Sequence, residues 1–495
     1  MNDQDLTCTS KLTRRNFLQN TAVAAAAIST ATAVVAAPQA ATGPNDRLRI
    51  AFIGLGERCG AHVGSAIQIH KELGNIEIAA VCDVFNRYRQ QFSEKIRTET
   101  KQTPKEISDY RDIINDPSID AVVIATPDHW HAKQTIDALR AGKHVYCEKP
   151  MTHSVDEALA VVKAWRESGL VMQVGVQSTQ VPVWPDARRR ICEGQLGKVL
   201  QYQTEFFRNS VMGQWRYYEL AADMTPKNID WNMFLGTEFN LAPDMPFDRE
   251  RFAQWRCYWE FGAGMFTDLF VHRTTSMLLA TGLRYPARVV GAGGIFLEYD
   301  GRNVPDVATV VADFNEGVQG IVTATMCCEY TPIQQLIRGH NGSFVFGTGE
   351  VFEGYDFVAE RPQVTLNSKI KNERIEIGKV PDTSYLHFKN FCDAARAGKP
   401  EMVACSPELG AAAMVIVKLG SESYRQGKVF HFDSETMTVS DGNPSWAQGW
   451  EKMSAERQPA RHVPGWKAGT TGSVLTPEAY QKLAGPWIGG VDPAP

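Results

Sequence analysis

The chain has 495 residues, which is too many for one ordinary hydrophobic core, so at least two domains are expected. Hydrophobic residues make up 43% and charged residues 22%, as in globular proteins. The net charge of −5 and the absence of a clustered basic stripe argue against a nucleic-acid partner.

The first forty residues have the form of an export signal. Arg14 and Arg15 precede an apolar, alanine-rich run over residues 21–37, and small residues follow it. This pattern resembles the bacterial twin-arginine signal, with Gln19 where a lysine is usual. We predict a signal peptide over residues 1–42, the twin-arginine export machinery as a partner, and a periplasmic or otherwise exported protein. An uncleaved membrane anchor is the alternative.

The predicted export route carries a consequence for the cofactor. The twin-arginine machinery moves folded proteins, so a nucleotide cofactor can be bound in the cytoplasm and carried across. We therefore expect a tightly bound cofactor. Folding in a reducing compartment also favours free thiols over disulfides.

After the signal, buried-type strands alternate with helices. The apolar runs predicted as strands are residues 49–54, 76–82, 121–125, 144–147 and 171–176. The helices between them are predicted at residues 60–73, 132–141 and 155–168. This alternation predicts an α/β, doubly wound parallel sheet, a Rossmann domain spanning residues 43–176.

The pattern changes after residue 177. Several of the predicted strands alternate apolar and polar residues, as a sheet with one open face does: residues 199–207, 287–297, 307–314 and 320–328. Helices are predicted at residues 387–397 and 407–426. We expect an α+β domain with an open, mostly antiparallel sheet over residues 177–440. Residues 441–495 are predicted to be an irregular extension.

A glycine-rich turn follows the first strand and opens the first helix. It contains Gly54, Leu55, Gly56 and Gly60, a spacing one residue longer than the usual dinucleotide fingerprint. Glycines let the backbone approach a pyrophosphate at a helix N-terminus, where free N–H groups favour anions. The turn therefore predicts a dinucleotide-binding site.

An acidic residue ends the second strand. Asp83 lies 23 residues after Gly60, near the spacing of a ribose-binding carboxylate. Such a carboxylate accepts hydrogen bonds from the ribose 2′-hydroxyl and repels a 2′-phosphate, so NAD is favoured over NADP. Arg87 lies close enough to weaken that preference.

Four ordered segments resemble one family. Residues 125–131 (ATPDHWH), 141–150 (AGKHVYCEKP), 264–272 (GMFTDLFVH) and 387–398 (HFKNFCDAARAG) are similar to the glucose–fructose oxidoreductase/inositol dehydrogenase/rhizopine catabolism (Gfo/Idh/MocA) family. The resemblance covers roughly residues 47–435. It implies an NAD(P)-binding Rossmann domain, a C-terminal domain with an open sheet, and a nicotinamide in the cleft between them.

The resemblance also implies the reacting groups. Lys149 would contact substrate and nicotinamide, and Asp268 and His272 would form the acid–base pair. The chemistry suits these types, because an imidazole titrates near neutral pH and can accept a hydroxyl proton. Asp268 lies four residues before His272, so on a helix the two share a face. A structural pair or half of a metal site are alternatives, but the sequence offers no third ligand, and we expect no metal.

Further residues are predicted at the two ends of the cleft. The predicted cofactor-binding residues are Gly54, Leu55, Gly56, Gly60, Asp83, Thr126, Pro127, His131, Glu148, Lys149 and Gln177. On the substrate side, residues 206–209 and the aromatic segment 255–259 are candidates. Core packing is an equally good explanation for most of them.

These features predict an exported NAD(P)-dependent oxidoreductase acting on a secondary alcohol of a sugar, polyol or glycoside. The alternative is a glycoside hydrolase or lyase that oxidises its sugar transiently, eliminates a group and returns the hydride. A sugar-binding protein without catalysis is disfavoured by the presence of Lys149, Asp268 and His272. The resemblance further implies pairing through the open sheet face, so a homo-oligomer is expected.

Overall fold

The computed structural model describes residues 47–331, 334–347, 353–365 and 369–441. The predicted signal peptide and C-terminal extension lie outside these residues and stay predictions. Within the described ranges, no helix is long and apolar enough to cross a bilayer.

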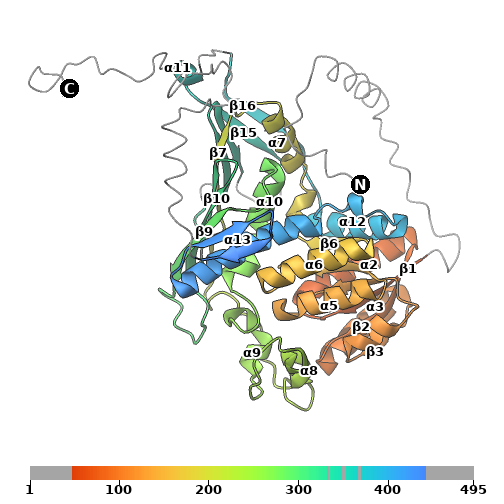
Figure 1. Ribbon diagram of the computed structural model, residues 1–495. Coiled ribbons are helices and arrows are strands. Elements are labelled where there is room, and N and C mark those ends of the chain that lie inside the picture. Colours follow the sequence, from red (N-terminus) through yellow and green to blue (C-terminus); the bar gives the residue numbers. More distant parts are fainter. Residues whose placement is uncertain (1–46, 332–333, 348–352, 366–368, 442–495) are drawn as a thin grey trace, which may run out of the picture.

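The N-terminal domain is a six-stranded parallel sheet in the order β3-β2-β1-β4-β5-β6. Its strands are β1 (Leu48–Ile53), β2 (Ile76–Cys82), β3 (Lys105–Ile107), β4 (Ala121–Ile124), β5 (His144–Glu148) and β6 (Met172–Gly175). Its helices are α2 (Glu57–Leu73), α3 (Asn86–Thr100), α4 (Tyr110–Asn115), α5 (Asp128–Arg140) and α6 (Val155–Ser168). The predicted doubly wound sheet is confirmed (Figure 1). The sequence did not predict β3, α3 and α4, because their apolar runs are short.

Local chemistry sets the ends of these helices. At α6, the Ser154 side chain accepts from the Glu157 N–H, and the Glu157 carboxylate accepts from the Ser154 N–H, which completes a capping box. Gly169 ends the same helix in the left-handed region at φ 66°. These signals explain why the predicted and observed bounds of α6 coincide.

The C-terminal domain is a ten-stranded sheet in the order β16-β15-β14-β13-β7-β11-β10-β9-β17-β18. Its strands are β7 (Val199–Glu205), β9 (Arg288–Gly294), β10 (Val307–Phe314), β11 (Val318–Thr325), β13 (Gln335–Gly339), β14 (Gly342–Phe346), β15 (Gly354–Ala359), β16 (Glu373–Glu376), β17 (Phe430–Asp433) and β18 (Thr438–Ser440). Neighbours pair antiparallel except β7 and β11, which are parallel. The predicted open, mostly antiparallel sheet is confirmed.

Alternation along the strands produces the two faces of this sheet. In β10, every second residue is buried, and β11 repeats the pattern in register. The other face carries exposed apolar side chains, including Val290 and Val358. Homo-oligomer formation through this face stays a prediction.

Helices and short elements connect and cover the sheets. They are α7 (Val183–Cys192), α8 (Trp231–Leu235), α9 (Arg249–Ala253), the 3₁₀ turn η4 (Trp255–Cys257), the π-helical turn η5 (Phe266–Phe270), α10 (Val271–Thr281), α11 (Pro362–Thr365), α12 (Thr383–Ala397) and α13 (Pro407–Gln426). A separate two-stranded ribbon pairs β8 (Arg208–Asn209) with β12 (Cys327–Cys328).

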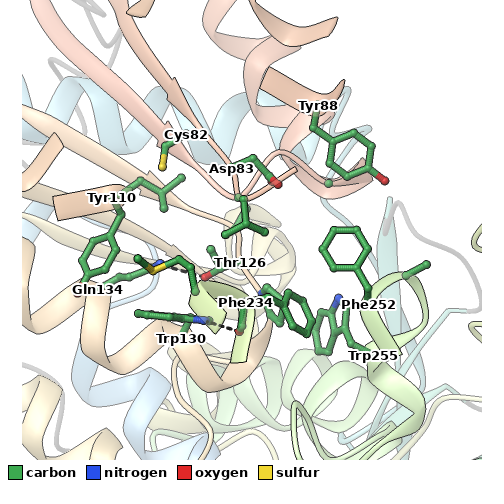
Figure 2. A pocket seen from close by; sticks show the side chains of 18 of the residues that line it. Cys82, Asp83, Tyr88, Tyr110, Thr126, Trp130, Gln134, Phe234, Phe252 and Trp255 are labelled. Atoms are coloured by element: carbon green, nitrogen blue, oxygen red, sulfur yellow. Dashed lines mark hydrogen bonds between the residues drawn. The ribbon is translucent and has the colours of Figure 1, made fainter. Parts of the chain in front are cut away.

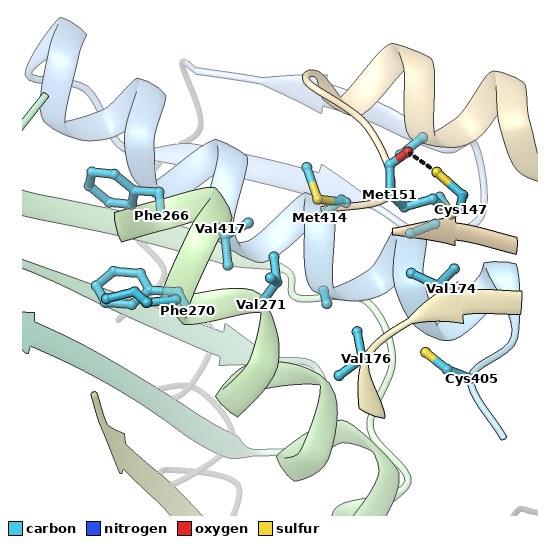
Figure 3. Close-up of a cluster of buried hydrophobic side chains, with 14 of the residues drawn as sticks. Cys147, Met151, Val174, Val176, Phe266, Phe270, Val271, Cys405, Met414 and Val417 are labelled. Carbon is cyan, nitrogen blue, oxygen red and sulfur yellow. Dashed lines mark hydrogen bonds between the residues drawn. The ribbon is translucent and has the colours of Figure 1, made fainter. Parts of the chain in front are cut away.

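One core runs through both domains, with α13 at its centre. Figure 3 shows Met414 and Val417 of α13 between Phe270 at the end of η5 and Val174 of β6. A second core lies on the other side of the Rossmann sheet. There α12 packs its Phe388 ring against Phe52 and Tyr146, although α12 comes after most of the second domain in sequence. The domains therefore share packing and hold the cleft between them in fixed geometry.

Candidate active site

The glycine-rich turn places the backbone close to the end of β4. Gly54 has φ +83°, and a Cβ there would lie 2.5 Å from the Thr126 nitrogen. Only glycine fits this position. Gly56 is the N-cap of α2, has open space where its Cβ would be, and has no capping side chain. The first N–H groups of α2 therefore stay available to an anion.

Asp83 holds this turn in place. Its carboxylate accepts from the Leu55 N–H at 2.6 Å and from the Phe85 N–H at 2.8 Å. Burial raises the pKa of Asp83 to about 6, against the opposing effect of these hydrogen bonds. Arg87 points away to an ion pair with Asp223 at 2.9 Å. Arg87, which weakened the prediction of NAD over NADP, is thus already paired with a carboxylate.

A cavity of about 860 Å³, the cofactor cavity, opens from this turn. The Rossmann side contributes Gly54, Gly56, Asp83, Thr126, Pro127 and Trp130, among others. The opposite wall comes from the second domain and includes Met233, Phe234, Phe252 and Trp255. Figure 2 shows these aromatic rings facing Asp83 and Thr126 across the cavity. Its mixed polar and apolar lining is that of a small-molecule site.

The covering wall is bound to the Rossmann domain at several points. The Trp130 indole N–H donates to the Phe234 carbonyl at 2.8 Å (Figure 2), and His129 Nε2 lies 2.8 Å from the same oxygen. Phe85 forms a β-bridge with Ile229. We call residues 221–257 the covering segment, because they close the cofactor cavity from the side of the second domain.

Two predicted cofactor residues act differently from the prediction. The Leu55 side chain is fully buried in the core, so only its backbone serves the turn. Gly60 lies within α2, lines neither cavity of the cleft, and has only Phe92 near its Cβ position, at 3.8 Å. The longer glycine spacing explains this, since the third glycine falls one residue further along the helix.

The cradle at Gly54, the uncapped start of α2 and the Asp83 carboxylate together fit a dinucleotide. An unpartnered polar atom adds to the fit: the buried Nη2 of Arg58 has no hydrogen-bond partner among the described residues. Arg58 lies in the first turn of α2, facing a second cavity next to the first.

This second cavity, the catalytic cavity, shares residues such as Thr126 and Trp255 with the cofactor cavity. Its wall brings together Lys149, Asp268 and His272, as predicted. The Lys149 ammonium donates to Asp268 Oδ1 at 2.7 Å and to the Asp268 carbonyl at 2.9 Å. An ammonium has three N–H donors, so one remains for a further acceptor.

Asp268 is an ion-pair partner rather than a partner of His272. Its carboxylate also accepts from Arg256 Nε at 3.2 Å and from the Trp215 indole at 3.0 Å. Burial raises the pKa of Asp268, but Lys149 and Arg256 outweigh it and hold the pKa far below its usual range. Asp268 lies in a π-helical turn that precedes α10, and it still lines the same cavity as His272.

His272 lies in the same wall, with its ring 6.4 Å from the Phe206 ring. Burial, and next the Lys149 charge, hold the pKa of His272 well below its usual value. The imidazole is therefore neutral at neutral pH and can accept a proton.

A buried cluster supports the turn before Lys149. The Glu148 carboxylate accepts from Arg58 Nε at 2.8 Å and from Gln177 Nε2 at 3.0 Å, and lies 2.8 Å from His62 Nε2. Burial opposes its charge, but Arg58 and His62 outweigh burial and hold the pKa of Glu148 well below normal. Glu148 and Gln177 line the catalytic cavity, so both predicted residues lie in the cleft.

His131 bridges the ends of two strands. Its Nδ1 lies 2.5 Å from the Pro150 carbonyl and its Nε2 2.8 Å from the Thr126 carbonyl. Burial opposes a charge on this ring, but Cys147, Asp128 and the Pro150 carbonyl raise the pKa of His131 to about 9. His131 lines the catalytic cavity as predicted, and both ring nitrogens bind backbone oxygens that position Thr126 and Lys149.

The sequence missed several functional neighbours. Trp215 has φ +67°, which is costly for a side chain of this size, and it uses that backbone to reach Asp268. Arg256 was named only within an aromatic segment, of which Trp255 lines the cleft while Trp259 packs beside Phe266. Arg58 was visible between the glycines, where a charged residue facing the ligand is a detectable signal.

Metal ligation has no site in the described part of the chain, where no three His, Cys, Asp or Glu side chains are grouped to hold an ion.

The fold and cleft define a two-domain dinucleotide-binding protein. Residues 48–176 match the family model for the GFO/IDH/MocA oxidoreductases, NAD-binding Rossmann fold, and residues 236–345 match a C-terminal domain model of the same family. Each model matches less than half of the chain, and the two matches follow one another in the order of an NAD-binding and a C-terminal domain.

Relatives and a solved structure agree with this assignment. A levoglucosan dehydrogenase of Pseudarthrobacter phenanthrenivorans is 34% identical over 27% of this chain and 37% of its own length. A glycosyl hydrolase family 109 protein of Shewanella pealeana is 31% identical over 31% and 36%. The matches thus span just over a third of each relative. A solved levoglucosan dehydrogenase, in complex with NADH and levoglucosan, shares the fold at TM-score 0.56 and 20% identity, covering 80% of this chain and 99% of that one.

Proposed function

We propose that this protein is an NAD(P)-dependent oxidoreductase that transfers a hydride between a secondary alcohol of a sugar, polyol or glycoside and a tightly held nicotinamide cofactor. One observation carries the proposal. The Lys149–Asp268 ion pair lies with a neutral His272 in a cavity that shares its wall with the NAD cavity. The relative named levoglucosan dehydrogenase supports a carbohydrate substrate.

The proposed chemistry divides between cofactor and chain. When bound, NAD supplies the hydride acceptor. The remaining N–H of Lys149 donates to the alcohol oxygen and stabilises negative charge that develops there. His272, neutral at this site, accepts the hydroxyl proton. Asp268 fixes Lys149 in position through two hydrogen bonds and does not itself exchange a proton, because its pKa is far below neutral.

The covering segment supports tight cofactor retention. Trp130 and His129 both bond the Phe234 carbonyl, and Phe85 pairs with Ile229, so release requires breaking several contacts between the domains. Slow release is compatible with the export that we also propose from residues 1–42. Replacing Arg14 and Arg15 by lysine should leave the protein in the cytoplasm. Export of that variant would contradict the export proposal.

The direct test uses the purified mature protein. We expect bound NAD or NADH to survive desalting and to appear in the supernatant after denaturation. Adding sugars and polyols should change the absorbance band of reduced nicotinamide for at least one of them. Cofactor-loaded protein that turns over no alcohol in a broad panel, with or without an added carbonyl acceptor, would contradict the proposal.

The relative named glycosyl hydrolase family 109 protein favours one second candidate. Transient oxidation acidifies a neighbouring C–H bond and allows a glycosidic group to leave, after which the hydride returns. The same residues serve the first step. Release of aglycone from a nitrophenyl glycoside without net change in the nicotinamide band would identify this reaction.

The pH dependence of turnover follows from His272. The neutral imidazole is the active form, and its pKa lies well below its usual value, so this form persists as pH falls through the ordinary histidine range. We expect kcat/KM to stay level from neutral pH down through about pH 6.5, the unperturbed value, and to fall only below that. His272→Gln should abolish this acidic limb and lower kcat. A limb centred at the ordinary histidine value would show that burial does not control this group.

A further inference from the structure

The charged groups of the catalytic cavity can be matched with one another. The basic side chains that line it are Arg58, His131, Lys149, Arg208 and Arg256, and the acidic ones are Glu57, Asp128, Glu148 and Asp268. The ring nitrogens of His131 bind the Pro150 and Thr126 carbonyls, and Asp128 helps to raise the pKa of His131. Arg58 pairs with Glu148 at 2.8 Å, and Asp268 pairs with Lys149 at 2.7 Å and Arg256 at 3.2 Å. Asp128 is buried, and burial raises its pKa to about 6.

Arg208 is the cation left over. Among the described residues its guanidinium has no carboxylate partner and no side-chain hydrogen bond, although the side chain lines the cavity and is half-buried. Glu57 does not compensate it, because Glu57 lies at the exposed start of α2, in the wall shared with the cofactor cavity. Arg208 is therefore the basic side chain of the catalytic cavity that has no acidic or hydrogen-bonding partner among the described residues.

The position of Arg208 is fixed by its surroundings. Its backbone pairs with Cys328 in the β8–β12 ribbon. Its guanidinium lies 4.8 Å from the centroid of the Phe206 ring, which Arg273 approaches at 4.7 Å. The same ring lies 6.4 Å from that of His272. The Phe206 ring thus holds the Arg208 guanidinium without using its N–H donors. Arg208 lines the same cavity as His272, the proposed base.

We propose that Arg208 binds a carboxylate of the substrate, so that this enzyme acts on an acidic sugar such as a uronic or aldonic acid. The proposal rests on the proposed function and names its substrate class. A guanidinium binds a carboxylate through two parallel hydrogen bonds, and an unpaired one inside a cleft is placed for that contact. A carboxylate presents two oxygens in one plane, which matches the planar guanidinium of a single arginine.

The test compares matched substrates in the holoenzyme. The panel contains glucose with glucuronate, galactose with galacturonate, and glucose 6-phosphate. We expect kcat/KM for the acid to exceed that for its neutral partner by about 10- to 100-fold, as for a hydrogen bond to a charged group. Arg208→Gln should remove this preference, mainly through KM, and should change kcat/KM of the neutral sugar far less than that of the acid. Arg208→Lys should restore part of it.

Three results would overturn the proposal. They are equal rates on acid and neutral sugars in the wild type, an equal loss on both in Arg208→Gln, and an Arg208-dependent preference for the phosphate ester over the carboxylate. Bound NAD serves as the folding control, since Arg208 is outside the cofactor cavity.

Calorimetric titration of glucuronate into the holoenzyme separates this proposal from the redox one. Arg208-dependent binding without turnover would contradict only the proposed reaction. Turnover of neutral sugars with no Arg208-dependent binding of acids would contradict only the carboxylate site.

Discussion

Lys149→Ala is expected to lower kcat by about 10²–10³-fold, the usual cost of losing one positioned donor to a developing oxyanion. The Lys149 ammonium donates two of its N–H groups to Asp268, which leaves one N–H group for the substrate oxygen. Lys149 does not line the cofactor cavity, so the amount of bound NAD should not change. Single-turnover kinetics monitored at the reduced-nicotinamide band measures the effect.

Two further variants separate charge from position. Lys149→Arg keeps a positive charge beside the Asp268 carboxylate but changes the geometry of the N–H donors, so we expect normal thermal stability with reduced kcat. Lys163→Ala removes an exposed lysine of the same domain, 4.0 Å from Glu167, and should behave as wild type. Full turnover by Lys149→Ala would contradict both the dehydrogenase and the transient-oxidation reaction, because both begin with the same step.

Gly54→Ala is expected to cause the largest loss of cofactor binding. The new Cβ would lie 2.5 Å from the Thr126 nitrogen and 2.7 Å from the Ala125 carbonyl carbon. Both are backbone atoms that cannot rotate away, and Thr126 lines both cavities. Overpacking costs about 1–3 kcal/mol, and the left-handed backbone adds about 1–2 kcal/mol.

Gly74→Ala is the matched control for this variant. Gly74 also has a positive φ, +63°, but nothing lies within 4 Å of its Cβ position. The Gly74→Ala variant should lose about 1–2 kcal/mol of stability, the cost of the left-handed backbone, and should still bind NAD. We expect Gly54→Ala to unfold at a lower temperature than Gly74→Ala and to retain at least ~10-fold less cofactor, which corresponds to about 1.4 kcal/mol. Equal behaviour would show that the close approach to β4 is unimportant.

The expected preference for NAD over NADP depends on the Asp83 carboxylate and on the orientation of the Arg87 side chain. Asp83 accepts two backbone N–H bonds that hold the glycine turn, and it faces the cavity where a ribose would lie. Arg87 forms an ion pair with Asp223, a residue of the covering segment, instead of turning toward a 2′-phosphate. The covering segment thus contributes to cofactor selection as well as to closure.

Much of the fold was predictable because the signals were local. The bounds of β2, α6 and α13 were predicted without error, since β2 is a short apolar run and each of the two helices follows a capping serine and stops before a glycine. The glycine turn and Asp83 were likewise found from spacing alone. Asp268 and His272 share the catalytic cavity, but the Asp268 carboxylate is bound by Lys149, Arg256 and Trp215, which spacing within one helix cannot report.

The sequence by itself determined the alternating domain and the nucleotide turn, and its resemblance to one family pointed to Lys149, Asp268 and His272. Only the tertiary structure decided which of the charged side chains form ion pairs with one another. Asp268 bonds Lys149 across 119 residues, and Trp215 and Arg256 complete its surroundings. Periodicity and spacing report neighbours within one element, whereas ion pairs across a cleft depend on how separate elements pack. For the same reason, Arg208 stands out as the unpaired cation only after folding has joined the other charges of the cavity.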